Sequence, residues 1–208
     1  VKANDISKFT RTIADMGVAT NLAGEEGATT IARFMNVMGE NIDNVDRVGS
    51  AIVHLGNNTA TSEAEIAAMA QRLGAYSATL GVSTADTLAY SAAMSSLGIE
   101  AEMGGSALGR TWLGIQSACV NGGAQLEAFA KYSGKSAEEF KKQWSTDPSG
   151  AFYGLLQGLS ALDKDSLVSS FGKMGIENTR DIQALMKLVG GYELLGDCLQ
   201  MSSKAYQE

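Results

Sequence analysis

The segment that most resembles a catalytic motif spans residues 104–111 and reads GGSALGRT. A phosphate-binding loop needs glycines at this spacing and then a lysine, because backbone N–H groups and the lysine hold the phosphates. Here Arg110 stands where the lysine is required, and Glu100 and Glu102 precede the glycines where a buried strand is expected. A turn between helices, with a break at Gly104-Gly105, explains the segment better. We therefore expect no nucleotide and no other cofactor.

Metal and nucleophile chemistry has few candidate residues in this chain. It contains one histidine and two cysteines, too few for the usual zinc ligand sets. His54 falls near a predicted helix end, where an imidazole can meet the terminal carbonyl groups. Cys119 and Cys198 lie in apolar, helical surroundings, and we expect both to be reduced thiols of the core. The sequence predicts neither a metal site nor a nucleophilic dyad.

Three pairs of acidic residues could do acid–base chemistry: Glu25/Glu26, Glu100/Glu102 and Glu138/Glu139. A glycosidase needs a carboxyl group of raised pKa in a sugar-binding cleft, which aromatic residues usually line. The first and third pairs fall in first turns of predicted helices, where acidic groups stabilise the helix dipole. Aromatic residues make up only 7% of the chain. We expect no catalytic residue and no enzyme activity; a cell-wall hydrolase with Glu100 as its acid is the alternative.

Glycines mark the ends of the helices that position these residues. Leu97-Gly98-Ile99 fits a Schellman cap, with Gly98 in the left-handed region and Ile99 folding back onto the preceding turn. Gly81 and the pair Gly175-Ile176 fit the same device. Three such stops predict helices that turn back on one another.

The helix starts are equally well marked. Ser62–Glu65 and Ser136–Glu139 are capping boxes, and Asp147-Pro148 supplies an N-cap followed by a proline at the first helical position. Within a longer helix, Trp112 shares a stripe with neighbouring apolar residues, so we expect it to be a buried anchor.

Hydrophobic periodicity predicts an all-α fold, a compact bundle of short helices joined by glycine-rich turns without a sheet. Residues 1–58 form an expected N-terminal helical part and residues 59–208 a helical core, or both belong to one continuous domain over 1–208. The predicted helices cover approximately residues 5–22, 25–38, 43–55, 62–80, 83–97, 106–121, 124–132, 136–144, 147–159, 165–174, 178–189 and 192–205.

Charge and hydropathy exclude two classes of partner. The net charge is −7, and the lysines between residues 131 and 142 are interrupted by acidic residues, so no basic surface for nucleic acid is expected. No apolar run reaches the roughly 18–20 residues that span a bilayer, so we expect no membrane contact. Because the chain begins with Val1, we interpret it as a segment of a longer protein.

Several motifs, in one order, resemble the core of phage tail tape measure proteins over roughly residues 61–195. They occupy residues 89–108, 129–130, 136–144, 147–152, 155–159, 167–176 and 179–185. The resemblance implies a structural module that acts in tail assembly and tail-length determination, located in the virion tail and, during assembly, in the cytoplasm of the bacterial host. It implies as partners other copies of the chain, the tail tube, the tail tip or baseplate, and assembly chaperones. A helical adaptor unrelated to phage is a further alternative.

Overall fold

A computed structural model describes residues 7, 9–14 and 25–207 of the chain. The described residues form α-helices and one short 3-10 helix, and none of them is in a strand, which confirms the all-α class. Residues 9–14 are helical, while the rest of the helix predicted over residues 5–22 lies mostly outside the described residues. The later elements are α2 (Glu25–Met38), η1 (Ile42–Asn44), α3 (Val45–Asn58), α4 (Glu63–Leu80), α5 (Thr84–Ser96), α6 (Ala101–Asn121), α7 (Ala124–Tyr132), α8 (Ala137–Thr146), α9 (Pro148–Ser160), α10 (Lys164–Lys173), α11 (Thr179–Gly190) and α12 (Tyr192–Gln207).

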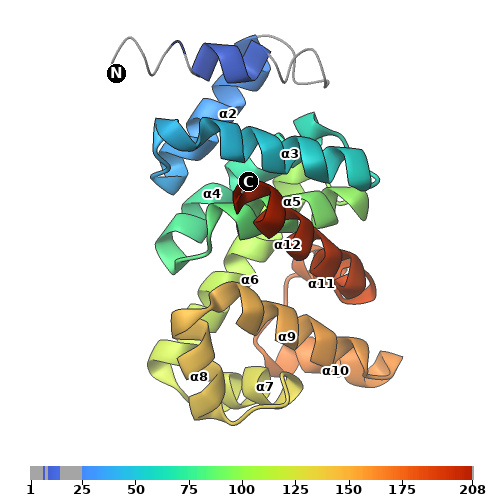
Figure 1. The fold of residues 1–208 in the computed structure, drawn as a ribbon. Helices are drawn as coiled ribbons and strands as arrows, with labels where there is room; N and C mark the ends of the chain where they lie inside the picture. Colours follow the sequence, from blue (N-terminus) through green and yellow to red (C-terminus); the bar gives the residue numbers. More distant parts are fainter. Residues whose placement is uncertain (1–6, 8, 15–24, 208) are drawn as a thin grey trace.

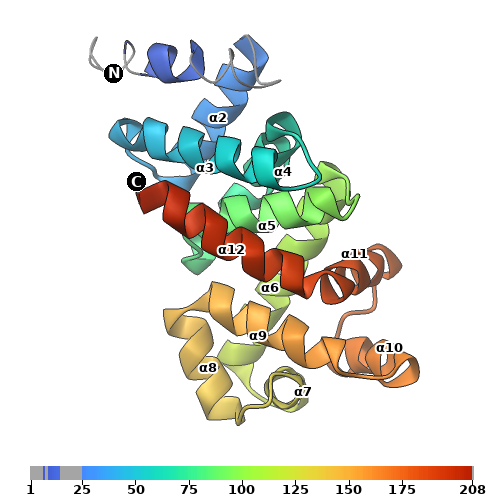
Figure 2. The same cartoon turned by 45° about the vertical axis from the view of Figure 1, so that its right-hand side comes forward.

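The helices gather into two groups that α6 connects (Figure 1). One group contains α2 to α5 together with α12, and the other contains α7 to α10. The last helix returns to the first group, where α12 packs against α3 and α5 (Figure 2). Because α11 packs against α6, it covers one side of the connecting helix.

Local hydrogen bonds account for most helix ends. Gly81, Gly98 and Gly175 have φ values of +77°, +66° and +75°, the left-handed backbone that the sequence predicts at these stops. After Gly98, the Ile99 N–H donates to the Met94 carbonyl at 3.0 Å, which closes a Schellman cap. Both predicted capping boxes are formed, and the Asp147 side chain accepts a hydrogen bond from the Gly150 N–H at 2.8 Å.

The break predicted at Gly104-Gly105 is wrong. Helix α6 begins at Ala101 and runs through both glycines, which are buried in its first turns. A Cβ atom at Gly104 would lie 2.6 Å from Met94 Cε, and one at Gly105 would lie 2.5 Å from Arg72 Cβ. The pair therefore permits close approach of α4 and α5 to α6, which is a packing role and needs no turn.

An aromatic cluster joins the two groups of helices. Trp112 on α6 is fully buried, with its ring centroid 5.3 Å from that of Tyr90 on α5 and 6.0 Å from that of Phe152 on α9. The Tyr90 hydroxyl donates to the Ser149 carbonyl at 2.9 Å. The cluster thus ties α5 and α9 to the middle of α6, where Trp112 is buried.

The described N-terminal helices are joined closely to the rest of the fold. Helix α2 packs on α4, and α3 packs on α4, α5 and α12. In the loop after α2, the Glu40 carboxylate accepts hydrogen bonds from Asn44 and from Thr84 at the start of α5. A domain boundary after residue 58 stays a prediction.

Candidate functional site

One face of α6 is left open to solvent between its neighbours. The stripe alternates steps of three and four residues along the helix, and its members are Met103, Ser106, Arg110, Leu113, Ser117 and Val120. Leu113 is 43% exposed and Val120 is 68% exposed. We call this set the α6 stripe.

The α6 stripe is the complement of the face that builds the core. Leu108, Trp112 and Ile115 lie on the opposite side of the helix and are fully buried. Helices α4 and α11 both pack against α6, so the open stripe lies between them. Isolated exposed apolar residues are common on protein surfaces, but apolar and small residues at this regular spacing are typical of a helix that pairs with another helix.

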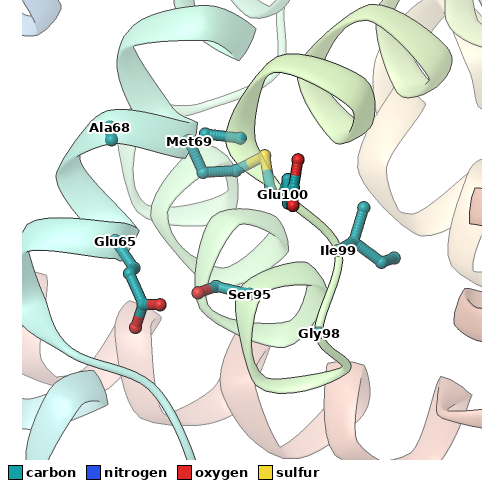
Figure 3. A pocket seen from close by; sticks show the side chains of 8 residues that line it. Glu65, Ala68, Met69, Ser95, Gly98, Ile99 and Glu100 are labelled. Carbon is teal, nitrogen blue, oxygen red and sulfur yellow. The ribbon is translucent and has the colours of Figure 1, made fainter.

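A pocket of about 200 Å³ lies beside the start of α6, where the chain turns from α5 into α6, and it shares no residue with the α6 stripe (Figure 3). Met69 and Ile99 lie beneath the pocket and are 0% and 2% exposed, and Glu65, Ser95 and Glu100 supply polar groups. In Figure 3 the Met69 side chain reaches toward Glu100. The pocket therefore places two carboxylates above a buried apolar floor.

The two carboxylates of this pocket differ in their partners. Glu65 accepts a hydrogen bond from the Ser62 N–H at 3.0 Å, and this bond to the backbone is the main cause that lowers the pKa of Glu65. Glu65 is consequently ionised at neutral pH. Glu100 is the N-cap residue of α6, but its side chain makes no capping hydrogen bond.

Two further hollows continue along the same helix. The first, of about 430 Å³, shares Glu100 with the corner pocket and is lined also by Glu102, Met103, Ser106, Arg110 and Arg180. The second, of about 390 Å³, shares Arg110 and extends to Gly175 and Ile176 at the end of α10. We call the three hollows together the α6 groove; two members of the α6 stripe, Leu113 and Val120, line none of them.

Arg110, which two hollows of the α6 groove share, forms an ion pair with α11. The Arg110 Nε and Nη2 groups donate to the two carboxylate oxygens of Asp181, at 2.9 and 2.5 Å. Asp181 is in the first turn of α11, where the Asn178 side chain caps the helix. This two-point contact attaches α11 to α6, and the Arg110 side chain is still 50% exposed.

The residues singled out from the sequence fall in different places. Gly98 and Ile99 line the corner pocket, and Gly175 and Ile176 line the far hollow. Gly104, Gly105 and Trp112 are buried within the fold. Gly81, Asp147 and Pro148 line none of the three hollows of the groove.

The candidates for catalysis are not assembled into an active site. His54 is exposed on α3, and the 104–111 segment is helical throughout. Cys119 and Cys198 are buried free thiols, and burial raises the pKa of Cys198 to about 12. Glu100 and Glu102 share a hollow that no aromatic residue lines. Within the part of the chain that the structure describes, no group of three or more His, Cys, Asp or Glu side chains could hold a metal ion.

The α6 stripe is the feature that our sequence reasoning missed. The spacing of Met103, Leu113 and Val120 is readable in the sequence, but the predicted break at Gly104-Gly105 divided the helix that carries them. With the helix drawn continuously from Ala101, the second stripe becomes visible beside the buried one.

Comparison with known proteins identifies the class of the chain. The family model for phage-related minor tail proteins matches residues 1–190. The chain therefore belongs to the phage-related minor tail protein family, which gives it a structural role in the phage tail. No curated protein and no solved structure matches it. No described helix is both long enough and apolar enough to span a bilayer.

Proposed function

We propose that this chain is a folded module of a tape-measure-type tail protein, acting in tail assembly and tail-length determination through contacts with other proteins. The family match over residues 1–190 is the observation that carries the proposal. The tape measure motifs between residues 61 and 195 narrow it within the family. Family membership also disfavours an adaptor unrelated to phage.

In this proposal the module serves to contact other tail proteins and adds little to the measuring length of the parent protein. As one continuous helix, the 208 residues would reach at most about 310 Å. The longest helix that the structure describes, α6, has 21 residues, and the described chain reverses direction repeatedly. A folded unit of this kind is suited to docking on a neighbour while other parts of the parent protein measure.

The proposed partners are other copies of the chain, the tail tube, the tail tip or baseplate, and assembly chaperones. In this proposal the protein is present in the host cytoplasm during assembly and in the virion tail afterwards. The α6 groove supports such a role, because acidic and basic side chains line one of its hollows beside the half-buried Met103.

Deletion of the module from the parent gene tests the proposal. We expect removal of residues 1–208 to abolish tails or to yield tails of aberrant length in electron micrographs, with recovery when the intact parent gene is supplied from a plasmid. Normal numbers of tails at normal length would contradict the proposal.

A zymogram on peptidoglycan tests the hydrolase alternative. We expect no clearing zone from the purified chain. A clearing zone that disappears in Glu100→Gln would show that the segment is an enzyme and would contradict a purely structural role.

A further inference from the structure

We propose that α12 exchanges between copies of the chain: it leaves the face of α3 and α5 that it covers in its own molecule, and α12 of a second copy occupies that face. The inference rests on the proposed function, since it names how copies of the module join one another in the tail. We call the covered face of α3 and α5 the α12 seat (Figure 2).

A single residue separates α12 from the helix before it. Helix α11 ends at Gly190 and α12 begins at Tyr192, so only Gly191 lies between them. The Gly191 N–H donates to the Lys187 carbonyl at 2.9 Å, and the Gly191 carbonyl accepts from the Leu195 N–H at 3.1 Å, as both groups do inside a helix. Since Gly191 has φ of −110° and ψ of 23°, rotation about this one residue would join α11 and α12 into a continuous helix. The 16 residues of α12 would then extend about 24 Å from the end of α11.

The hinge at Gly191 is crowded while the chain is bent there. A Cβ atom at Gly191 would lie 2.6 and 2.7 Å from the two methyl carbons of Leu97, at the end of α5. The bend therefore favours glycine, which has no Cβ atom and disfavours a continuous helix. A Cβ atom at the neighbouring Gly190 would meet nothing within 4 Å. Only the second of these two glycines thus limits the bend.

The α12 seat binds its helix through contacts that a second copy can reproduce. The Ser202 hydroxyl donates to the Ala85 carbonyl of α5 at 2.6 Å, and the Tyr206 hydroxyl donates to the Glu40 carboxylate. The buried residues of α12 are Leu195, Cys198, Ser202 and Ala205. Because a second copy carries the same helix, exchange restores each of these contacts and leaves no seat empty. The occupant of this face is therefore the α12 sequence itself.

The other helices are held together without α12. Helices α3 and α5 both pack on α4, and Tyr90 of α5 contacts Trp112 of α6. Lys187 of α11 donates to the Gly98 carbonyl at 2.9 Å, which keeps α11 attached to the end of α5. The family match ends at residue 190, where α11 ends. Helix α12 can therefore leave its seat while the rest of the fold keeps its contacts.

The exchange depends on how close the copies are. The same contacts form within one chain and between two chains, so the exchanged dimer differs from two monomers mainly in its straightened hinges and in its lost translational freedom. Copies held side by side in one tail experience an effective concentration of about 1 mM, which offsets that loss. In this proposal the dilute chain is mainly a monomer, and copies in the tail are linked through α12.

Substitution at the hinge tests the exchange. Gly191→Ala favours a continuous helix and places a methyl group against Leu97 in the bent form, so it should promote the exchanged dimer. Light scattering after size-exclusion chromatography should show dimerisation about tenfold tighter, or more, than for the unsubstituted chain. The control is Gly190→Ala, which adds a methyl group inside α11 and should dimerise as the unsubstituted chain does.

Two further measurements show whether α12 is the exchanged part. In a mixture of isotope-labelled and unlabelled Gly191→Ala copies, isotope-filtered NMR should detect cross-peaks between Ser202 of one copy and Ala85 of the other. Leu195→Glu added to Gly191→Ala should abolish the dimer, since it places a charge on the buried side of α12. Gln200→Glu adds the same charge on the exposed side of α12 and should leave the dimer intact.

Three outcomes would overturn the inference: dimerisation of Gly191→Ala no tighter than that of Gly190→Ala, a dimer without cross-peaks between copies, or a dimer that survives Leu195→Glu. If circular dichroism shows Gly191→Ala to be unfolded, the mixed-label experiment on the unsubstituted chain at about 1 mM decides, and missing cross-peaks there overturn the inference as well.

The exchange and the tail role can fail separately. If no exchange is found while deletion of the module still abolishes tails, the exchange is rejected and the tail role stands. If exchange is found but deletion leaves tails normal, the tail role is rejected.

Discussion

The contact between α4 and α6 and the contact between α7 and α9 bring helices together in different ways. Along α6, three glycines over two turns face side chains of neighbouring helices, among them Arg72 and Tyr76 of α4. In the second group, the Phe129 ring of α7 stacks on Phe140 of α8, and one glycine, Gly158 of α9, meets the backbone of α7 at the Tyr132 carbonyl. The outer atoms of a side chain can shift when a methyl group is added, whereas backbone atoms, and a Cβ atom fixed to them, move only with the whole helix. A glycine that contacts the backbone of a neighbouring helix should therefore tolerate an added methyl group less well than glycines that face side chains.

The largest effect is expected at Gly158. A Cβ atom there would lie 1.7 Å from the Tyr132 carbonyl oxygen, so Gly158→Ala must separate α9 from α7. We expect a loss of about 3 kcal/mol or more in the free energy of unfolding, measured by urea denaturation. Gly154→Ala on the same helix meets only the Lys135 Nζ atom at 4.0 Å and should stabilise by up to about 1 kcal/mol. Equal stability of the Gly158→Ala and Gly154→Ala variants would contradict the claim that the close backbone contact at Gly158 limits substitution.

A substitution at Gly98 tests how much an unfavourable backbone conformation costs in stability where steric contact adds little. Its φ of +66° is strained for a β-branched residue, while only Lys187 Nζ, at 3.9 Å, lies near its Cβ position. We expect Gly98→Val to cost about 2 kcal/mol. Gly190→Ala, in a helical position with nothing within 4 Å, should cost nothing. Thermal melts compare the two, and equal losses would contradict the role of the left-handed cap.

A smaller effect is expected where a glycine faces side chains. A Cβ atom at Gly105 would lie 2.5 Å from Arg72 Cβ, and the exposed Arg72 side chain can move only if α4 shifts slightly. We expect Gly105→Ala to destabilise by about 1–2 kcal/mol. The control is Gly114→Ala, later on α6, where nothing lies within 4 Å and alanine should gain up to about 1 kcal/mol. A loss at Gly105 as large as that at Gly158 would show that the stripe is as rigid as the backbone contact.

The smallest expected effect is a pH dependence shared by the two groups of helices. Glu65 on α4 and Glu139 on α8 each accept a backbone hydrogen bond, from Ser62 and Ser136, and this bond lowers the pKa of each carboxyl group. The folded pKa is below the unfolded value of about 4.3, so the stability is present above that value and is lost as the pH falls through the folded pKa. Glu65→Gln and Glu139→Gln should each flatten the fall in melting temperature between about pH 5 and pH 3. Unchanged melting profiles would indicate that neither box contributes.

Much of the helix pattern was predictable because the signals that set it are local. Ser62, Ser136 and Asp147 cap backbone groups no more than three residues away, so their effect is readable from a short window. The same holds for Gly98, whose cap closes within the preceding turn. The interpretation of Gly104-Gly105 as a break failed because glycine in a helix and glycine in a turn look alike until the neighbouring helix is in place.

The candidate site was predictable only in part. Gly98, Ile99, Gly175 and Ile176 were singled out as turn residues, and the fold places them at the two ends of the α6 groove. The chemistry of the groove comes from residues that no local pattern connects. Arg110 and Asp181 are 71 residues apart, and Glu65 reaches the corner pocket from a different helix than Glu100.

By itself, the sequence determined where most helices begin and end, that no strand competes with them in the described chain, and which side of each helix is apolar. These properties depend on hydrogen bonds and side-chain spacing within a few residues. Only the tertiary structure decided which apolar side is covered: Trp112 is enclosed by Tyr90 and Phe152, whereas Leu113 beside it stays open. Whether an apolar helix face is buried depends on which helices from distant parts of the sequence pack against it. That packing involves the whole chain and cannot be read from a short window.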